Sequence, residues 1–312
     1  ITLVIVMIAV VFSMVESITL LKNNYYWRSQ YFLMQWDYLK TEAMFSQYKN
    51  GGISNSIFSK QPNASGIPSP ENTQSIPILL YHGVINNPKW KPDGVSISLS
   101  EFRAQMFALK TAGYQTVNLE DYLAFSRGQK DLPKKSFVLT FDDGRNDSYY
   151  PVDPIIRTLG YTAIMNVITG RSLASEKEKS SFHLSQDELK KMLESGRWEM
   201  ASHTRNGHGY VKIDSNEKDG HFLSNKIWLN DKKRLETDDE YKKRIYDDLL
   251  ASKNDLEKKL GVKALAFAYP FGDFGQVSDN FPESRNIIID IAKSIYPLSF
   301  AQAGSSDFLT NY

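Results

Sequence analysis

The sequence predicts an α/β fold built on a parallel sheet, because short apolar runs alternate with amphipathic segments from residue 76 onward. Glycines and capping residues separate these segments, as expected when strands and helices alternate. The predicted strands are 78–81, 137–141, 161–168, 198–201 and 264–269. The pattern is compatible with an open sheet and with a sheet that closes into a barrel.

The predicted helices between these strands have recognisable first and last residues. Ser98 and Ser185 are each followed three residues later by glutamate, the capping-box pattern of a helix start. Gly113, Gly160 and Gly261 follow amphipathic segments and are typical of the residue just after a helix. We therefore expect each of these segments to be a helix that packs on the sheet.

The first residues of the sequence are strongly apolar. Within 1–15 only Thr2 and Ser13 are polar, and the apolar run continues to Lys22 with Glu16 as an interruption. At ~1.5 Å per residue, 21 helical residues span about 30 Å, the thickness of a bilayer core. We expect an uncleaved transmembrane anchor at 1–21, with a signal peptide and a buried helix as alternatives. The protein would then be a single-pass protein of the cell membrane whose remaining residues are extracellular.

Two further regions follow the apolar run. Residues 22–75 predict a stalk and flexible linker, helical up to about residue 49 and then rich in Ser, Asn, Gly and Pro. Residues 76–312 form the predicted folded domain. Within it, the charged stretch 209–240 has few large apolar residues, which predicts an insertion loop.

Composition excludes several classes of function. The chain of 312 residues has 37 Lys and Arg against 36 Asp and Glu, a net charge of +1, so nothing indicates a nucleic-acid partner. There are no cysteines, which excludes disulfides, thiolate nucleophiles and cysteine-ligated zinc. Any metal ion must be bound by histidine and carboxylate side chains.

The segment TFDDG follows the predicted strand at 137–141 and brings two carboxylates, Asp142 and Asp143, to a strand end. Active sites of parallel α/β folds form at the carboxyl ends of strands. Neighbouring residues of an extended chain point in opposite directions, so one carboxylate can bind a metal ion while the other faces substrate. An ordinary Asp-Gly turn is the alternative interpretation.

The segment SHTRNGH follows the strand at 198–201 and contains His203 and His208. A spacing of five does not place two side chains on one face of a helix, but a curled loop can bring both imidazoles to one ion. These are two of the five histidines of the chain. We therefore interpret them as metal ligands, although solvated loop histidines are common.

Two other strand ends are weaker candidates. His82 ends the strand in LLYHGV and is interpreted equally well as a buried structural residue or a catalytic one. The segment FAYPFG, which includes Phe271, is interpreted as a packed strand end followed by a turn, and it has no ionisable catalytic group. His183 and His221 lie in polar loops without a partner pattern, so the sequence gives them no role.

Together, TFDDG, the two-histidine loop and the strand-end Tyr-Pro-Phe-Gly turn resemble the signature motifs of the polysaccharide deacetylases, carbohydrate esterase family 4. The spacing of the histidines, the Tyr-His at the first strand end and the A-Y-P-F-G segment resemble the poly-N-acetylglucosamine deacetylases of biofilm matrix. The resemblance covers about residues 76–312. It implies a distorted (β/α) barrel of about seven strands, and it leads us to expect a further strand and an arginine-containing segment after Tyr312.

The resemblance also implies roles for individual residues. Asp143, His203 and His208 resemble the metal-binding triad, for one divalent ion with Zn²⁺ favoured and Co²⁺ or Ni²⁺ as alternatives. Asp142 resembles the general base that deprotonates the attacking water. His82 resembles the general acid that protonates the departing amine, a task suited to a group that titrates near neutrality. The backbone N–H of Phe271 resembles the donor that stabilises the oxyanion.

The expected activity is therefore hydrolytic N-deacetylation of an extracellular N-acetylglucosamine polymer, with poly-N-acetylglucosamine as the favoured substrate. Peptidoglycan or another wall glycan is an alternative substrate, and a catalytically inactive carbohydrate-binding module is an alternative of another class. A glycosidase needs two carboxylates on either side of a sugar and has no use for the histidine pair. Ala268 stands where most of the family has an arginine that tunes the base, so the sequence leaves open how Asp142 is held.

Overall fold

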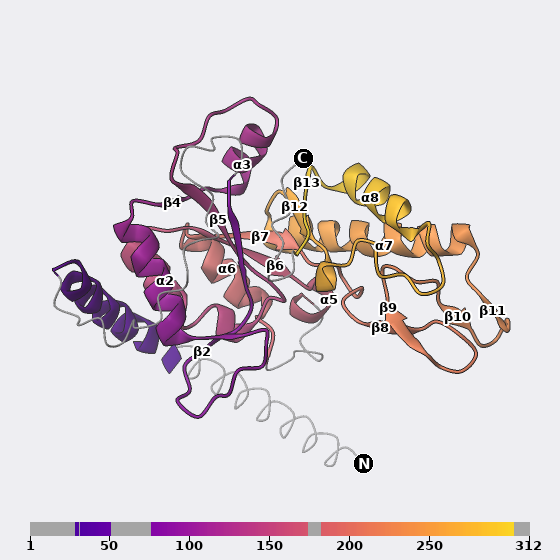
Figure 1. Cartoon of the computed structure of the whole chain (residues 1–312), viewed down its shortest axis with the longest axis horizontal. Coiled ribbons are helices and arrows are strands. Elements are labelled where there is room, and N and C mark those ends of the chain that lie inside the picture. The colour runs from indigo at the N-terminus through magenta and orange to yellow at the C-terminus, as the bar shows by residue number, and fades with distance from the viewer. Residues whose placement is uncertain (1–28, 31, 51–75, 174–181, 303–312) are drawn as a thin grey trace, which may run out of the picture.

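The computed structural model describes residues 29–30, 32–50, 76–173 and 182–302 (Figure 1). The predicted anchor at 1–21 and the linker at 51–75 lie outside these residues. Among the residues described, no helix is long and apolar enough to cross a membrane.

A seven-stranded parallel sheet forms the centre of the domain, with strand order β1-β5-β6-β7-β12-β13 and β4 paired with the first residues of β5. The strands of this sheet are β1 (Ile78–Tyr81), β4 (Gln115–Thr116), β5 (Ser136–Phe141), β6 (Ala163–Val167), β7 (Trp198–Ser202), β12 (Ala266–Ala268) and β13 (Leu298–Phe300). All their ladders are parallel. The five predicted strands are confirmed, and β4 and β13 are additions that the sequence pattern did not indicate.

The α-helices lie between the strands along the chain and pack on the sheet. They are α2 (Leu99–Thr111), α3 (Leu119–Ser126), α4 (Asp153–Leu159), α5 (Thr169–Ser172), α6 (Gln186–Glu194), α7 (Asp238–Asp255) and α8 (Ser284–Ile295). The capping boxes at Ser98 and Ser185 are confirmed, and Gly160 ends α4 in the left-handed conformation. Helical turns also occur at η2 (Asn146–Ser148), η4 (Leu256–Leu260) and η5 (Pro270–Gly272).

Alternate side chains of the strands enter two hydrophobic cores. Phe137, Leu139 and Phe141 of β5 point to the larger core, where α2, α4, α6 and α7 contribute their apolar faces. Val138, between them, packs in a smaller core with Leu119 and other residues around α3. Because both faces of the sheet are buried, its central strands are mostly apolar, as the apolar runs predicted.

The sheet curls but stays open. In the part of the chain that the structure describes, β1 and β13 are the two ends of the strand order and share no ladder. The α/β class and the seven strands are confirmed, and the expected distorted barrel is an open half-barrel over the described residues. Curling matters for the site because it turns the carboxyl ends of β1, β5, β7 and β12 toward one another.

Residues 32–49 are helical, as expected for the stalk, and pack against the domain (Figure 1). Met34 is buried in the larger core, and the rings of Phe45 and Phe107 lie 4.9 Å apart. Arg157 of α4 donates a hydrogen bond to Gln35. The described part of the predicted stalk is therefore an outer layer of the folded domain.

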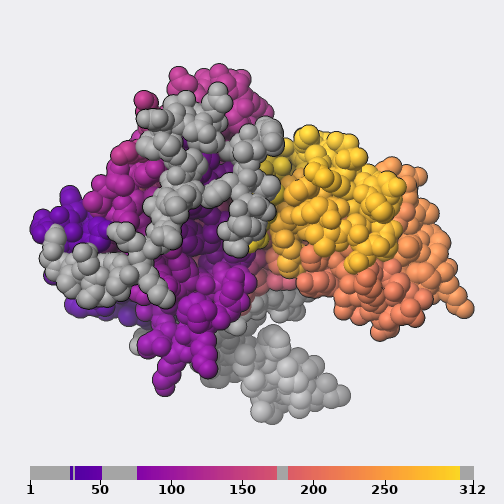
Figure 2. All heavy atoms as spheres, in the orientation of Figure 1, coloured from indigo at the N-terminus to yellow at the C-terminus, as the bar shows by residue number. Residues whose placement is uncertain are grey.

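The predicted insertion loop at 209–240 contains two short antiparallel hairpins. They consist of β8 (Tyr210–Lys212) with β9 (Asp219–His221), and of β10 (Trp228–Leu229) with β11 (Arg234–Leu235). A further pair, β2 (Val84–Ile85) with β3 (Ile97–Ser98), follows β1. In Figure 2 the orange segment with the hairpins and the yellow α8 form one side of the molecule, beside the indigo to magenta half.

Candidate active site

Four strand ends of the parallel sheet bring the candidate residues together. The register pairs Tyr81 of β1 with Phe141 of β5, so His82 and Asp142 occupy equivalent positions one residue beyond their strands. Ser202 of β7 pairs with Phe267 of β12, which brings the histidine loop beside the Pro-Phe-Gly turn. Side chains that are far apart in the sequence therefore meet at one edge of the sheet.

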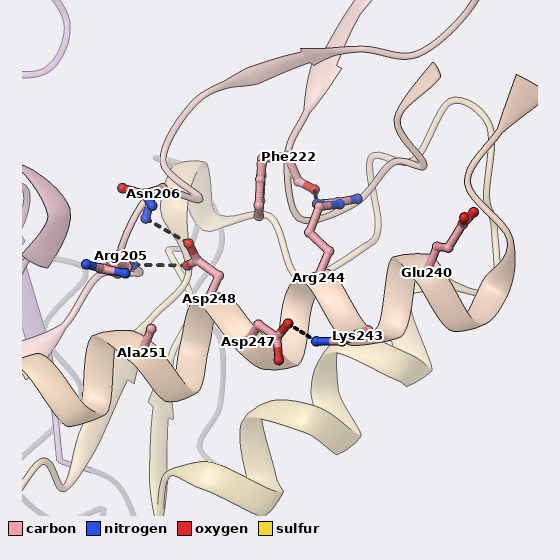
Figure 3. Close-up of a pocket in the computed structure, with 9 residues that line it drawn as sticks. All are labelled: Arg205, Asn206, Phe222, Glu240, Lys243, Arg244, Asp247, Asp248 and Ala251. Carbon is pink, nitrogen blue, oxygen red and sulfur yellow. Dashed lines mark hydrogen bonds and ion pairs between the residues drawn. The ribbon is translucent and has the colours of Figure 1, made fainter. Parts of the chain in front are cut away.

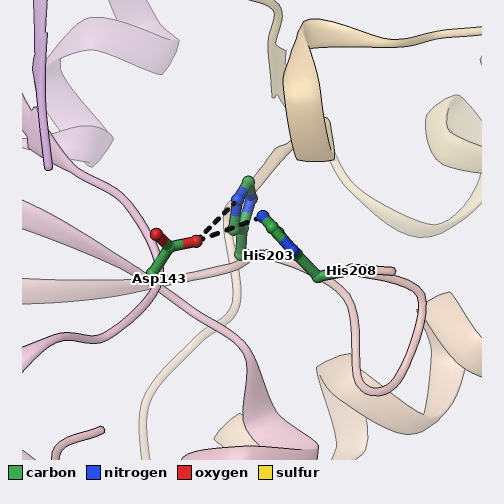
Figure 4. A group of neighbouring side chains, drawn as sticks. All are labelled: Asp143, His203 and His208. Atoms are coloured by element: carbon green, nitrogen blue, oxygen red, sulfur yellow. Dashed lines mark ion pairs between the residues drawn. The ribbon is translucent and has the colours of Figure 1, made fainter. Parts of the chain in front are cut away.

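Asp143, His203 and His208 form a compact cluster whose side chains point toward one another (Figure 4). Oδ1 of Asp143 lies 3.2 Å from Nε2 of His208 and 3.6 Å from Nε2 of His203. One ligand atom from each residue lies within 4.8 Å of the other two. Burial raises the pKa of Asp143, but the close approach of His208 and His203 outweighs burial and holds the pKa well below its usual range.

The cluster fits a small divalent cation. Ligands at ~2.0–2.1 Å from a tetrahedral ion lie about 3.3–3.4 Å apart, close to the two separations measured here. Oδ1 of Asp143 is buried and accepts no well-aligned hydrogen bond, although two imidazole nitrogens face it. Two nitrogens and one carboxylate oxygen are the ligands that Zn²⁺ accepts when cysteine is absent.

The orientation of His203 suits a metal ligand. The ring is buried, and its Nδ1 lies 2.8 Å from the backbone carbonyl of Ala268 in β12. A carbonyl accepts a hydrogen bond only from N–H, so Nδ1 carries the proton and Nε2 presents a free lone pair to Asp143. Burial lowers the pKa of His203 to about 4, with a contribution from the charge of His208, so the imidazole is neutral at pH 7.

Asp142 is buried and lies between this cluster and His82. Its Oδ2 is 3.8 Å from Nε2 of His203 and 3.9 Å from Nε2 of His82. Oδ1 accepts a hydrogen bond of 2.6 Å from the side-chain amide of Asn166 in β6. Burial raises the pKa of Asp142 to about 6, while His82 and the bond from Asn166 lower it. Asn166 thus supplies a donor to the carboxylate in a chain that has Ala268 in place of the expected arginine.

His82 follows β1 and joins the cluster from the other side. Its side chain is about one-sixth exposed, so it reaches both the buried Asp142 and solvent. The Ser148 hydroxyl donates a hydrogen bond to the backbone carbonyl of His82 and so fixes the end of the strand. The structure therefore places His82 beside Asp142, and its catalytic role stays a prediction.

Phe271 lies in the turn after β12, and its ring contacts His208, with the ring centres 4.5 Å apart. Its backbone has a φ of 59°, the left-handed region that a phenylalanine rarely adopts. Gly272 follows at φ 63°, where a Cβ would lie 2.9 Å from the carbonyl oxygen of Gln302. The turn therefore needs glycine at 272 and holds Phe271 in a strained conformation.

Backbone strain is concentrated at the site. Asp143, Thr204 and Phe271 are three of the five non-glycine residues with positive φ among the described residues. They belong to the loops after β5, β7 and β12 respectively. Each such residue costs about 1–3 kcal/mol, and strain of this kind is usually kept where it positions functional groups.

Asp248 on α7 holds the loop that contains both histidines (Figure 3). Its two carboxylate oxygens accept hydrogen bonds from the backbone N–H groups of Arg205 and Asn206, at 3.0 and 2.8 Å. These residues line an open pocket of about 510 Å³ with Phe222, Glu240, Lys243, Arg244, Asp247 and Ala251. The pocket lies on the α7 side of the loop and includes none of the three clustered residues, so we assign it no role in the chemistry.

The structure corrects the interpretation of the two remaining histidines, which have partners that the sequence did not reveal. Nδ1 of His183 lies 3.0 Å from the backbone carbonyl of Asp143, and burial lowers the pKa of this histidine. Nδ1 of His221 lies 2.6 Å from the carboxylate of Asp273. No local signal indicates either contact, because the partners lie 40 and 52 residues away along the chain.

The model of the polysaccharide deacetylase family matches residues 129–284, half of the chain. The match includes Asp142, Asp143, His203, His208 and Phe271 but not His82.

Curated relatives include the poly-β-1,6-N-acetyl-D-glucosamine N-deacetylases of Escherichia coli (strain K12) and Staphylococcus aureus (strain MRSA252). Each is 28% identical to this chain, over 189 and 177 residues respectively, and each match covers 57% of this chain. The matches cover only 28% of the first relative and 54% of the second.

A similar solved structure is a de-N-acetylase from Aggregatibacter actinomycetemcomitans. It has a TM-score of 0.61 and is 24% identical in sequence. The match covers 72% of this chain and 87% of that one. At this level of identity the likeness shows a shared fold.

Proposed function

Since this chain belongs to the polysaccharide deacetylase family, we propose that it hydrolyses the acetamide groups of a poly-N-acetylglucosamine chain outside the cytoplasm. Water and an N-acetylglucosamine residue are consumed, the C–N bond of the amide is broken, and acetate and a free amine are released. The observation that carries the proposal is that Asp142, Asp143, His203 and His208 meet His82 at one edge of the sheet. The names of the curated relatives support the choice of polymer.

In the proposed site, Asp143, His203 and His208 hold one divalent cation, for which Zn²⁺ is the best fit to the ligand set. Such an ion supplies Lewis acidity, which polarises the amide carbonyl and makes water more acidic. The protein contributes a preformed ligand set, because the Ala268 carbonyl fixes the tautomer of His203 and Asp248 fixes the loop.

Asp142 acts as the general base in this proposal. A carboxylate buried beside the ligands can accept the proton of the attacking water, and a raised pKa makes it a better base than an exposed aspartate. The Asn166 amide occupies Oδ1, which leaves Oδ2 facing His82 and His203. The backbone N–H of Phe271 donates to the oxyanion that forms on the carbonyl oxygen.

His82 acts as the general acid. An amine leaves a tetrahedral carbon only when it is protonated, and imidazolium is the natural donor near neutral pH. The 3.9 Å between His82 Nε2 and Asp142 Oδ2 puts acid and base beside each other. In this proposal, the general acid and the general base therefore both act on the C–N bond of one acetamide group.

We place this activity on the outer side of a membrane, with residues 1–21 as the anchor. The support is the apolar run itself, long enough for a bilayer core. Protease treatment of intact cells tests this proposal, because an anchored external domain is digested while the cells stay whole. Recovery of the full chain from the cytosol would contradict it.

One assay tests the activity. The purified chain is incubated with N-acetylglucosamine oligomers of β-1,6 and β-1,4 linkage and with peptidoglycan, before and after metal removal by a chelator. We expect release of acetate, most rapidly from the β-1,6 oligomer, that stops with the chelator and returns with Zn²⁺. Faster release from peptidoglycan would assign a wall glycan as substrate. Sugar binding by the metal-loaded chain without any acetate release would indicate an inactive binding module.

A further inference from the structure

Four rings form a continuous row that begins at the proposed metal site and ends in solvent. His208 contacts Phe271, Phe271 contacts Tyr210, and His221 lies flat against Phe271. The ring centres of these pairs are 4.5, 5.5 and 4.5 Å apart, and the planes of His221 and Phe271 differ by 14°. Two of these residues, Tyr210 and His221, pair across the β8–β9 hairpin.

Two rings of this row are exposed. Tyr210 is 62% exposed and Phe271 is 40% exposed, although both are large enough to favour burial. The fold keeps the Phe271 side chain there at the cost of a strained backbone with φ 59°. Adjacent exposed aromatic rings beside a catalytic site indicate a surface that binds a ligand.

A buried carboxylate fixes the orientation of His221, one of the rings of this row. Asp273, which is 1% exposed, lies 2.6 Å from Nδ1 of His221 and accepts a hydrogen bond from the backbone of Gly275. The His221 ring therefore has a fixed orientation and supports one face of Phe271. The same contact ties the β8–β9 hairpin to the turn after β12.

We propose that Tyr210 and Phe271 form an aromatic platform that binds a pyranose ring of the polymer next to the sugar that loses its acetyl group. This inference rests on the proposed function. One face of a pyranose presents C–H groups, which the negative face of an aromatic ring attracts, while the hydroxyl groups at its edge remain in water. Contact with His208 makes the platform continuous with the proposed metal site. His221 and Asp273 are positioning residues for it.

The test compares Tyr210→Ala, which removes the outer ring, with Tyr210→Phe, which keeps it. Tyr246→Ala is the matched control, because Tyr246 is also exposed but lies on α7. Each protein is assayed on N-acetylglucosamine oligomers from monomer to hexamer and on 4-nitrophenyl acetate, which has no sugar to bind.

For Tyr210→Ala we expect kcat/KM on the longer oligomers to fall roughly tenfold, mainly through KM, because one stacking contact is lost. The monomer, 4-nitrophenyl acetate and the metal content should be unaffected, and Tyr210→Phe and Tyr246→Ala should resemble the parent protein. An equal loss on 4-nitrophenyl acetate, or no loss on the oligomers, would overturn the platform.

Calorimetric titration with the hexamer separates this inference from the proposed function. If the metal-loaded protein releases no acetate from any sugar, the proposed function fails, yet weaker hexamer binding by Tyr210→Ala still supports the platform. Equal affinities of the parent and variant proteins, or no binding by the parent protein, would overturn it.

Discussion

The side-chain amide of Asn166 donates a 2.6 Å hydrogen bond to Oδ1 of Asp142, from the next strand of the sheet. Both side chains are almost completely buried. A buried carboxylate without such a donor would favour its neutral form, which cannot act as a base. The amide therefore helps to keep Asp142 in the ionised form that the proposed general base requires.

Replacement of this amide should move the acid side of the pH profile. Burial raises the pKa of Asp142 to about 6 and the Asn166 bond lowers it, so Asn166→Leu raises it further. Activity needs the ionised carboxylate and is lost as the pH falls through this pKa. A bound cation lowers the pKa, so we expect the acidic limb of kcat/KM at about 6 or below in the parent protein and at higher pH in Asn166→Leu.

Met165→Leu is the control for this experiment, since Met165 lies on the same strand but packs in the larger core and the exchange conserves volume. A limb that stays in place in Asn166→Leu would contradict the role given to this amide.

Loss of one imidazole should empty the metal site. His203→Ala removes a ligand atom that the Ala268 carbonyl orients, so we expect metal content after dialysis to fall to a small fraction of the parent value. The thermal stabilisation that added Zn²⁺ gives the parent protein, about 2.7 kcal/mol at 100 times Kd, should disappear as well. Met165→Leu serves as the control, because Met165 packs in the larger core and is not one of the clustered ligands. Full metal occupancy in His203→Ala would refute the ligand assignment.

His82→Ala should separate catalysis from metal binding. Loss of a general acid typically lowers kcat 10²- to 10⁴-fold, and the clustered ligands remain intact in this variant. We expect normal metal content, an unchanged melting temperature and a flattened basic side of the pH profile. Loss of metal would make His82 a ligand, and a near-normal kcat would exclude it as the acid.

Asp248→Ala should weaken metal binding although Asp248 is not among the clustered ligands. Its carboxylate holds the backbone N–H groups of Arg205 and Asn206, and partners that orient ligands typically contribute 10- to 100-fold in metal affinity. Competition with a fluorescent chelator measures the change in Kd. Asp247→Ala is the matched control, because the neighbouring Asp247 is exposed and pairs with Lys243. Equal metal affinities of the two variants would show that the loop holds its shape without Asp248.

The sequence predicted the strand ends well because apolar runs, capping residues and turn glycines are local signals. The cluster of Asp143, His203 and His208 could be predicted for the same reason, since these residues follow such runs, and His82 was a weaker candidate at another strand end. Asn166 could not, because a single asparagine inside the apolar segment 163–167 gives no indication of what it faces.

Asp248 and His221 were missed for a related reason. Asp248 lies among the charged residues of α7 and resembles a surface residue, although it is 8% exposed. His221 acquires its partner only when β9 meets the turn after β12. Contacts of this kind depend on how distant segments pack, which no local pattern records.

Tyr210 and His221 lie on one hairpin, whereas the clustered ligands and Asp142 lie on the strand ends or in the loops that follow them directly. In the proposed function, the hairpin therefore contributes to polymer recognition through Tyr210, while Phe271 in the turn after β12 takes part in both recognition and chemistry. Exchange of residues 209–222 for another hairpin would replace both side chains in one step and leave the metal ligands unchanged. A new polymer preference could thus arise by modular substitution, provided that the new hairpin keeps a partner for Asp273.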